Sequence, residues 1–160
     1  MPMIKQEQTF DTVSVSETIP APVAKVWRAW TVPEEKMKWW GRTERLKLVL
    51  CEMDVRVGGH YRYGMAAAGD TEVSEAAHGT YQTVEKEKRL VYSWTWGGEN
   101  PSVRDTLVTV TFESVDGNAT RITVTHERQP SERVAAIHTE GWTNKLSDLV
   151  LHATSMARAK

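Results

Sequence analysis

The pattern of apolar and polar positions divides this 160-residue chain into regions of different period. Residues 8–19 are rich in β-branched side chains and end at Pro20, which predicts a first strand. From Arg42 onward the apolar positions alternate with period two over most of the remaining chain. Loop-forming residues interrupt this alternation, so it predicts six successive strands, at residues 43–52, 55–65, 74–84, 89–97, 104–114 and 119–128.

Two helical segments lie between the first strand and this run. After Pro22, apolar residues recur at helical spacing, at Val23, Val26, Trp27 and Trp30. A second short helix is expected over residues 33–41, because acidic residues occupy its start and Gly41 suits its end. On such a helix Trp39 and Trp40 point about 100° apart, so one apolar stripe cannot bury both and one of them is expected at the rim of a cavity. The competing interpretation is a staple between this helix and the sheet.

A long amphipathic helix is predicted at about residues 131–157. Ser131 suits its N-cap, and one stripe carries Val134, His138, Trp142, Leu146, Leu149 and Ala153. A twisted antiparallel sheet and such a helix each need a partner face, and both are covered when the sheet curls around the helix. The order β-α-α-β6-α therefore predicts a single α+β domain, structured over about residues 8–157, that leaves room for a cavity between sheet and helix.

The stretch "RLVYSWTWGGENP" carries an aromatic residue at every second position, because Tyr92, Trp94 and Trp96 share one face of a strand. For a single strand, ordinary core packing is the favoured interpretation and the wall of a ligand cavity is the alternative. In a curled sheet, this face points inward together with Tyr61, Tyr63, Tyr81 and Trp142. Aromatic rings with polar edges suit a pocket for an amphipathic molecule, whereas a wholly apolar core more often uses Leu, Ile and Phe.

Composition excludes several classes of partner and site. The formal charge of −1 provides no electrostatic footprint for nucleic acid or an anionic membrane. Cys51 is the only cysteine, so neither an intramolecular disulfide nor a cysteine-rich metal site is expected, and a cytoplasmic location follows most simply. No apolar run approaches the roughly 18 residues needed to span a bilayer, and the first residues lack the apolar core of a signal peptide.

The histidines predict neither a metal site nor a catalytic residue. His138 and His152 lie on nearly the same face of the last helix but about 21 Å apart along it, and no His-Glu-x-x-His motif occurs. His126 and His138 are both expected to point inward. No adjacent nucleophile or oriented carboxylate is evident, so a satisfied core or cavity histidine is favoured over a general base. Both are therefore candidate polar contacts for a ligand, and no cofactor is predicted.

Five stretches, in this order and spacing, carry a family resemblance: "IPAPVAKVWRAWTVPEEKMKWWG", "DVRVGGHYRY", "GTYQTVEKEKRLVYSWTW", "VTVTFE" and "HTEGWTNKLSDL". The chain resembles the branch of activator-of-heat-shock-protein-ATPase homologues within the START-like, birch-pollen-allergen-type (SRPBCC) superfamily. The resemblance runs through nearly the whole chain. It implies a helix-grip fold that encloses a cavity for apolar or amphipathic small molecules, and it implies no catalytic motif.

The sequence thus favours a domain that binds a small hydrophobic or amphipathic molecule. An enzyme of the polyketide-cyclase or aromatase type and a protein-interaction module related to chaperone cofactors remain as alternatives. The predicted ligand contacts are Trp40, Tyr61, Tyr63, Tyr81, Trp94, Trp96, His126, His138 and Trp142.

Overall fold

Strands and helices follow one another as the sequence predicts: one strand, two helices, six strands and a final helix. The computed structural model describes residues 11–41, 46–67, 69–70, 72–73, 75–96 and 103–158. Its elements are β1 (Val13–Ile19), α1 (Val23–Thr31), α2 (Pro33–Lys36), β2 (Leu46–Met53), β3 (His60–Ala67), β4 (Glu75–Glu85), β5 (Arg89–Trp96), β6 (Thr106–Val115), β7 (Ala119–Glu127) and α3 (Glu132–Arg158). Parts of the predicted first and second strands lie outside the described residues.

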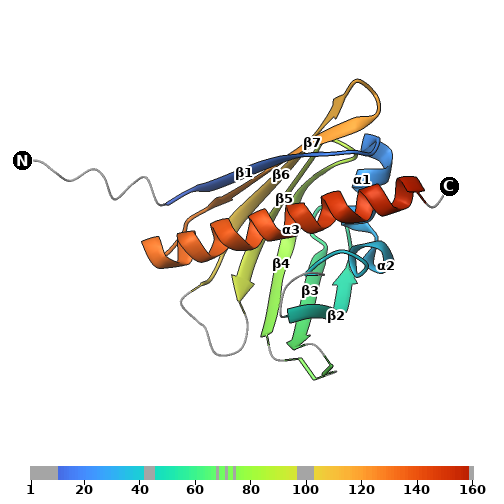
Figure 1. Cartoon of the computed structure of the whole chain (residues 1–160). Helices are drawn as coiled ribbons and strands as arrows, with labels where there is room; N and C mark the ends of the chain where they lie inside the picture. The colour runs from blue at the N-terminus through green and yellow to red at the C-terminus, as the bar shows by residue number, and fades with distance from the viewer. Residues whose placement is uncertain are drawn as a thin grey trace, which may run out of the picture.

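The seven strands form one antiparallel sheet in the order β1-β7-β6-β5-β4-β3-β2. Consecutive strands from β2 to β7 are neighbours, and β1 joins the far edge beside β7. Helix α3 crosses one face of this curled sheet, and α1 and α2 lie on the same side (Figure 1). The arrangement is the predicted α+β helix-grip fold. No helix in the described part of the chain is long and apolar enough to cross a membrane.

The core lies between the inner face of the sheet and the helices. On β5, Leu90, Tyr92 and Trp94 are buried, whereas the side chains between them are only partly buried. The stripe of α3 meets this face, since Trp142, Leu146 and Leu149 are buried. The backbone N–H of Val134 donates to Oγ of Ser131 at 3.1 Å, which confirms the predicted N-cap. Period two in the strands and the helical stripe therefore identified the buried faces correctly.

The second helix is shorter than predicted, and the two adjacent tryptophans that follow it are both buried. Helix α2 ends at Lys36, and residues 37–41 form a turn that closes at Gly41 with φ +73°. Trp39 and Trp40 are both buried, with 0% and 3% of their surface exposed. The Trp39 indole N–H donates to the carbonyl oxygen of Ala29 at 2.9 Å. Trp39 packs against Trp30 and Trp40 against Tyr63, so two different surfaces bury the residues that one apolar stripe was not expected to bury together.

The third predicted strand begins five residues later than expected, at His60. Residues 54–59 form a turn instead, with Gly58 in the left-handed region at φ +86°. At Gly59 an added Cβ would lie only 2.0 Å from the backbone oxygen of Asp54, so only glycine fits this turn. The turn and its two glycines replace the first part of the predicted strand.

Candidate functional site

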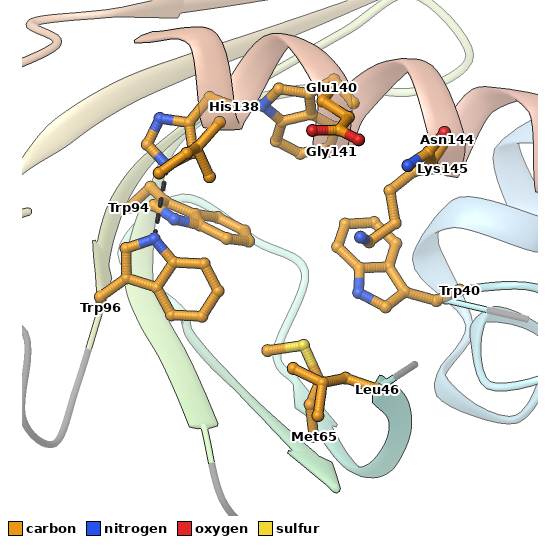
Figure 2. A pocket seen from close by; sticks show the side chains of 12 residues that line it. Trp40, Leu46, Met65, Trp94, Trp96, His138, Glu140, Gly141, Asn144 and Lys145 are labelled. Atoms are coloured by element: carbon orange, nitrogen blue, oxygen red, sulfur yellow. Dashed lines mark hydrogen bonds between the residues drawn. The ribbon is translucent and has the colours of Figure 1, made fainter. Parts of the chain in front are cut away.

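A pocket of about 480 Å³ lies between α3 and the inner face of the sheet (Figure 2). This volume falls within the range of roughly 300–1,000 Å³ that small-molecule sites occupy. Aromatic and apolar side chains line it from five separate segments: Trp40, Leu46, Met65, Trp94, Trp96, Ile137 and Trp142. The remaining lining residues all belong to α3: His138, Glu140, Gly141, Asn144 and Lys145. The pocket thus has a mainly indole wall and a polar edge on one helix.

Local geometry explains how these side chains meet. Trp94 and Trp96 are two residues apart on β5, so both face the inner side of the sheet. His138, Trp142 and Lys145 follow one another at spacings of four and three residues, which places them on one face of α3. The pocket therefore forms where the end of β5 faces residues 137–145 of α3.

The tryptophan rings hold one another through ring contacts. The Trp142 ring centroid lies 5.7 Å from that of Trp94 and 5.7 Å from that of Trp40. The Trp94 and Trp96 rings meet edge to face, with centroids 5.8 Å apart. Such aromatic contacts each contribute about 0.5–1.5 kcal/mol beyond the area that they bury. The pocket wall is consequently supported from several sides.

Hydrogen bonds fix the tautomer of His126. The hydroxyl of Thr106 donates to the carbonyl oxygen of Trp94 at 2.7 Å, so its oxygen is available only as an acceptor for His126 Nε2 at 2.8 Å. The indole N–H of Trp142 donates to His126 Nδ1 at 3.1 Å. His126 therefore carries its proton on Nε2, is neutral, and has both ring nitrogens occupied.

His138 is neutral as well, with the opposite tautomer. Its Nδ1 lies 2.6 Å from Oε1 of Gln129, whose amide nitrogen donates to the carbonyl oxygen of His126 at 3.1 Å. An amide oxygen only accepts, so Nδ1 of His138 carries the proton. Nε2 then accepts the indole N–H of Trp96 at 3.3 Å. His138 lines the pocket, so the lone pair of this Nε2 is an acceptor at the pocket wall.

Burial makes both imidazoles weak bases. It lowers the pKa of His126 to about 3, with a further contribution from the neighbouring His138, and lowers the pKa of His138 to about 4. A general base works best when its pKa lies near the operating pH. At neutral pH, His138 is therefore suited to accept a hydrogen bond from a ligand rather than to remove a proton. Among the described residues, no three His, Cys, Asp or Glu side chains are grouped to hold a metal ion.

A buried lysine lies directly behind the pocket wall. Lys36 has no exposed surface, and its Nζ donates to the carbonyl oxygen of Trp30 at 3.1 Å. The ring centroids of Trp40, Trp30 and Tyr63 lie 4.5, 4.6 and 5.2 Å from this nitrogen. Burial lowers the pKa of Lys36 to about 7, although the nearby Cys51 acts in the opposite direction. No sequence pattern predicts that Lys36 is buried, because a lysine at the end of a short helix is normally exposed.

The structure separates the predicted ligand contacts into two groups. Five of them line the pocket: Trp40, Trp94, Trp96, His138 and Trp142. Behind the pocket, Tyr61 packs against Tyr63 and Tyr81, with centroids 4.8 and 5.6 Å away. His126 is fully buried beside His138. For these four, ligand contact stays a prediction.

Tyr61 also borders a second, polar hollow of about 580 Å³ on the opposite face of the sheet. The Tyr61 ring borders this hollow because Gly79 has no side chain to cover it: an added Cβ at Gly79 would lie 2.8 Å from Cε2 of Tyr61. The other residues of this hollow are Glu52, His60, Arg62, His78, Thr80, Ser93, Thr95 and Asp105. Their mixed charges present no single chemical preference.

Sequence reasoning missed several pocket residues, of which Gly141 and Lys145 matter most. A glycine inside a long helical pattern is a recognisable signal, because it lowers helix stability without an evident reason. An added Cβ at Gly141 would meet no described atom within 4 Å, so close packing does not require the glycine. Lys145 carries no comparable signal, since its position over the Trp40 ring, 5.3 Å from the centroid, depends on tertiary structure.

The fold and the position of the pocket define a helix-grip protein of the START-like, SRPBCC class. The chain belongs to the family described as "Activator of Hsp90 ATPase homolog 1-like protein", which matches residues 20–153. No curated protein matches the sequence significantly.

Solved structures share this fold at low sequence identity. Ms6760 from Mycobacterium smegmatis is 20% identical over 97% of this chain and 98% of its own, with a TM-score of 0.75. The AHSA1-like protein from Aeromonas hydrophila is 22% identical over 93% of this chain and 95% of its own, with a TM-score of 0.73. DynU16, a protein of the dynemicin biosynthetic locus, is 24% identical over 89% of this chain and 46% of its own, with a TM-score of 0.67.

Proposed function

We propose that this protein binds a small amphipathic molecule, aromatic or lipid-like, in the pocket between α3 and the sheet. The observation that carries the proposal is the 480 Å³ pocket with four tryptophans and one neutral histidine in its lining. Apolar walls with a few oriented polar groups are the usual construction of a small-molecule site. The single cysteine of the chain favours a reducing compartment, so a cytoplasmic role is part of the proposal.

Gly141 supports this proposal independently of the aromatic residues. A glycine in a helix interior costs about 1 kcal/mol relative to alanine. Here the glycine lies in the pocket lining, and an added Cβ would meet no described atom within 4 Å outside its own stretch of helix. A loss of helix stability that leaves room at a pocket is the pattern expected of a binding site, where function competes with stability.

A second candidate is an enzyme of the cyclase or aromatase type, in which polar groups of the pocket guide a reactive chain. The fold shared with DynU16, whose gene lies in a biosynthetic locus, is the observation that favours it. The weak basicity of His138 argues for binding first, because at pH 7 an imidazole with a pKa of about 4 is a poor proton acceptor. A substrate whose conversion falls at least a hundredfold in His138→Ala would favour the enzyme.

A third candidate follows from the family description, which refers to activation of a chaperone ATPase. It proposes a protein-interaction module rather than a pocket protein. Purification of the chain together with a chaperone, retained when the pocket is filled by mutation, would favour this candidate over the first.

The test of the first proposal combines a ligand screen with a pocket-filling variant. Tryptophan fluorescence of the chain should change saturably with amphipathic aromatic compounds or fatty acids, with dissociation constants between about 1 mM and 1 μM. Gly141→Leu places a side chain in the pocket and should abolish the response while the protein stays folded. Gly141→Ala is the matched control and should retain most of it. If no compound produces a saturable change, the proposal is wrong.

A further inference from the structure

We infer that the ligand is an aromatic molecule with two different polar ends: an acceptor oxygen, in the favoured case a carboxylate, at Trp40 and a hydroxyl or N–H donor at His138. This inference rests on the proposed function and specifies the chemistry of its ligand. Figure 2 shows the two recognition groups on opposite walls of the pocket, with Trp40 and Lys145 facing Trp96 and His138 across it.

The first argument is an unsatisfied donor in the wall. Among the described residues, the indole N–H groups of Trp40 and Trp94 have no hydrogen-bond acceptor, and both side chains are at least 96% buried. Buried N–H groups in native proteins nearly always have a partner, so each unsatisfied one requires an explanation. Both belong to residues of the same pocket. Trp94 lies beside Trp96 and His138 (Figure 2), so the donor on the opposite wall is that of Trp40, and a ligand oxygen at this wall would satisfy it.

The second argument is the positive charge around Trp40. Its ring centroid lies 4.5 Å from Nζ of Lys36 and 5.3 Å from Nζ of Lys145. A cation close to an indole ring draws electron density from it, which strengthens the N–H as a donor. Glu140 is the carboxylate among the lining residues, but its side chain is exposed and its charge is screened by solvent. With a pKa of about 7, Lys36 is charged only in part at neutral pH, so the preference for an anion rests mainly on Lys145. The Trp40 wall therefore favours an acceptor, and an anionic acceptor most.

His138, on the opposite wall, has the reverse preference. His138 presents Nε2 as an acceptor, because Gln129 holds its proton on Nδ1. Its present donor is the indole N–H of Trp96, at a long 3.3 Å, and Trp96 is only partly buried. A ligand hydroxyl can replace Trp96 as the donor to Nε2, and water can then satisfy the displaced indole. A neutral His138 has no proton on Nε2 to offer, so this nitrogen does not suit a carboxylate.

Calorimetric titration at pH 7.5 with three naphthalene probes tests the two ends separately. The probe 6-hydroxy-2-naphthoate has both ends, 6-methoxy-2-naphthoate lacks the donor, and 2-naphthol lacks the carboxylate. We expect the first probe to bind about tenfold more tightly than either of the others. Trp40→Phe keeps an aromatic ring but removes the indole N–H. This variant should lower the affinity for both carboxylate probes about tenfold and change the affinity for 2-naphthol by less than about twofold.

His138→Phe should show the reverse selectivity, with loss for the two hydroxyl probes and little change for the methoxy probe. Lys145→Met should weaken the two carboxylates several-fold, by an amount that decreases with added salt, and Lys38→Met serves as the control. Lys145 lies on the helix surface, so this variant tests the acceptor end even where Trp40→Phe fails to fold.

The possible outcomes separate the inference from the proposed function. Equal affinities for the three probes, or variants that weaken all probes alike, would overturn the inference and leave binding itself established. Saturable binding of other amphipathic compounds but none of the three probes would also overturn the inference. If neither the probes nor the wider set of compounds bind, both the inference and the proposed function are wrong.

Discussion

The imidazole rings of His126 and His138 stack with their centroids 4.3 Å apart and their planes 23° apart. One residue belongs to β7 and the other to α3, so the pair joins the sheet to the closing helix behind the pocket. Both rings are held neutral: Trp142 donates to His126, and Trp96 donates to His138. A proton added to either accepting nitrogen would face an indole N–H and would place a charge beside the other ring.

Acid should therefore destabilise the fold through this pair. Unfolded histidines titrate near 6.5, whereas in the native state the pKa of His126 is about 3 and that of His138 about 4. Between these values the unfolded state binds more protons, so the free energy of unfolding falls as the pH decreases from about 6.5 to 4. Each histidine contributes about 1.4 kcal/mol per pH unit within its window. Chemical denaturation at pH 7.5, 5.5 and 4.5 measures this slope.

His138→Gln should reduce the slope, because one titrating group is removed. His78→Gln is the control, since that side chain is exposed on the outer face of the sheet. An unchanged pH dependence in His138→Gln would show that the pair does not govern acid stability.

Lys36 should produce a second pH effect, in the alkaline range. An unfolded lysine titrates near 10.5, and burial lowers the native pKa of Lys36 to about 7. The unfolded state holds the extra proton between these values, so stability rises with pH from about 7 to 10 by roughly 1.4 kcal/mol per unit. The cost of the buried charge is fully present below pH 7. Denaturation curves at pH 6, 8 and 9.5 follow the effect.

Lys36→Met should remove this alkaline rise. At pH 6 it should be at least as stable as the natural chain, because an apolar side chain of similar volume replaces a buried cation. Lys38→Met is the matched control, as that side chain is 57% exposed. A variant much less stable than the natural chain at pH 6 would mean that the aromatic rings and the carbonyl of Trp30 stabilise the ammonium by more than its burial costs.

Trp142→Ala should lower the free energy of unfolding by roughly 3–5 kcal/mol, because a large buried side chain leaves a cavity. The indole is 4% exposed and contacts the rings of Trp40 and Trp94. Thr143→Ala, at the next and exposed position of α3, should have little effect. A denaturation midpoint that Trp142→Ala leaves unchanged would remove Trp142 from the core.

Trp96→Leu should weaken ligand binding more than folding. Trp96 is partly buried at the end of β5 and forms part of the pocket wall, so leucine keeps an apolar surface there but removes a ring and the donor to His138. We expect affinity to fall about tenfold and the free energy of unfolding to change by less than about 1 kcal/mol. Titration and denaturation of the same preparation compare the two effects, with Leu151→Ala on the exposed side of α3 as the control. Equal losses in both would assign Trp96 to the core.

The order of the elements and their buried faces could be predicted because period two and helical spacing record which side of each element meets the core. This is why Tyr92, Trp94 and Trp142 were expected to point inward and do so. The same logic did not predict that both Trp39 and Trp40 are buried, because they pack against two different surfaces, Trp30 and Tyr63. A local pattern predicts one buried face of an element and holds no record of a second.

The division of the aromatic residues between core and pocket was decided by the tertiary structure alone. Tyr63 and Trp94 both face inward from their strands, yet Trp94 lines the pocket and Tyr63 does not. Trp40 and Lys36 cover the Tyr63 ring, at 5.4 and 5.2 Å from its centroid, and no alternation along one strand records what another segment places over it. Lys36 and Lys145 reach Trp40 from different helices for the same reason. The sequence by itself determined which faces are apolar, and the crossing of helix and sheet determined where space remains between them.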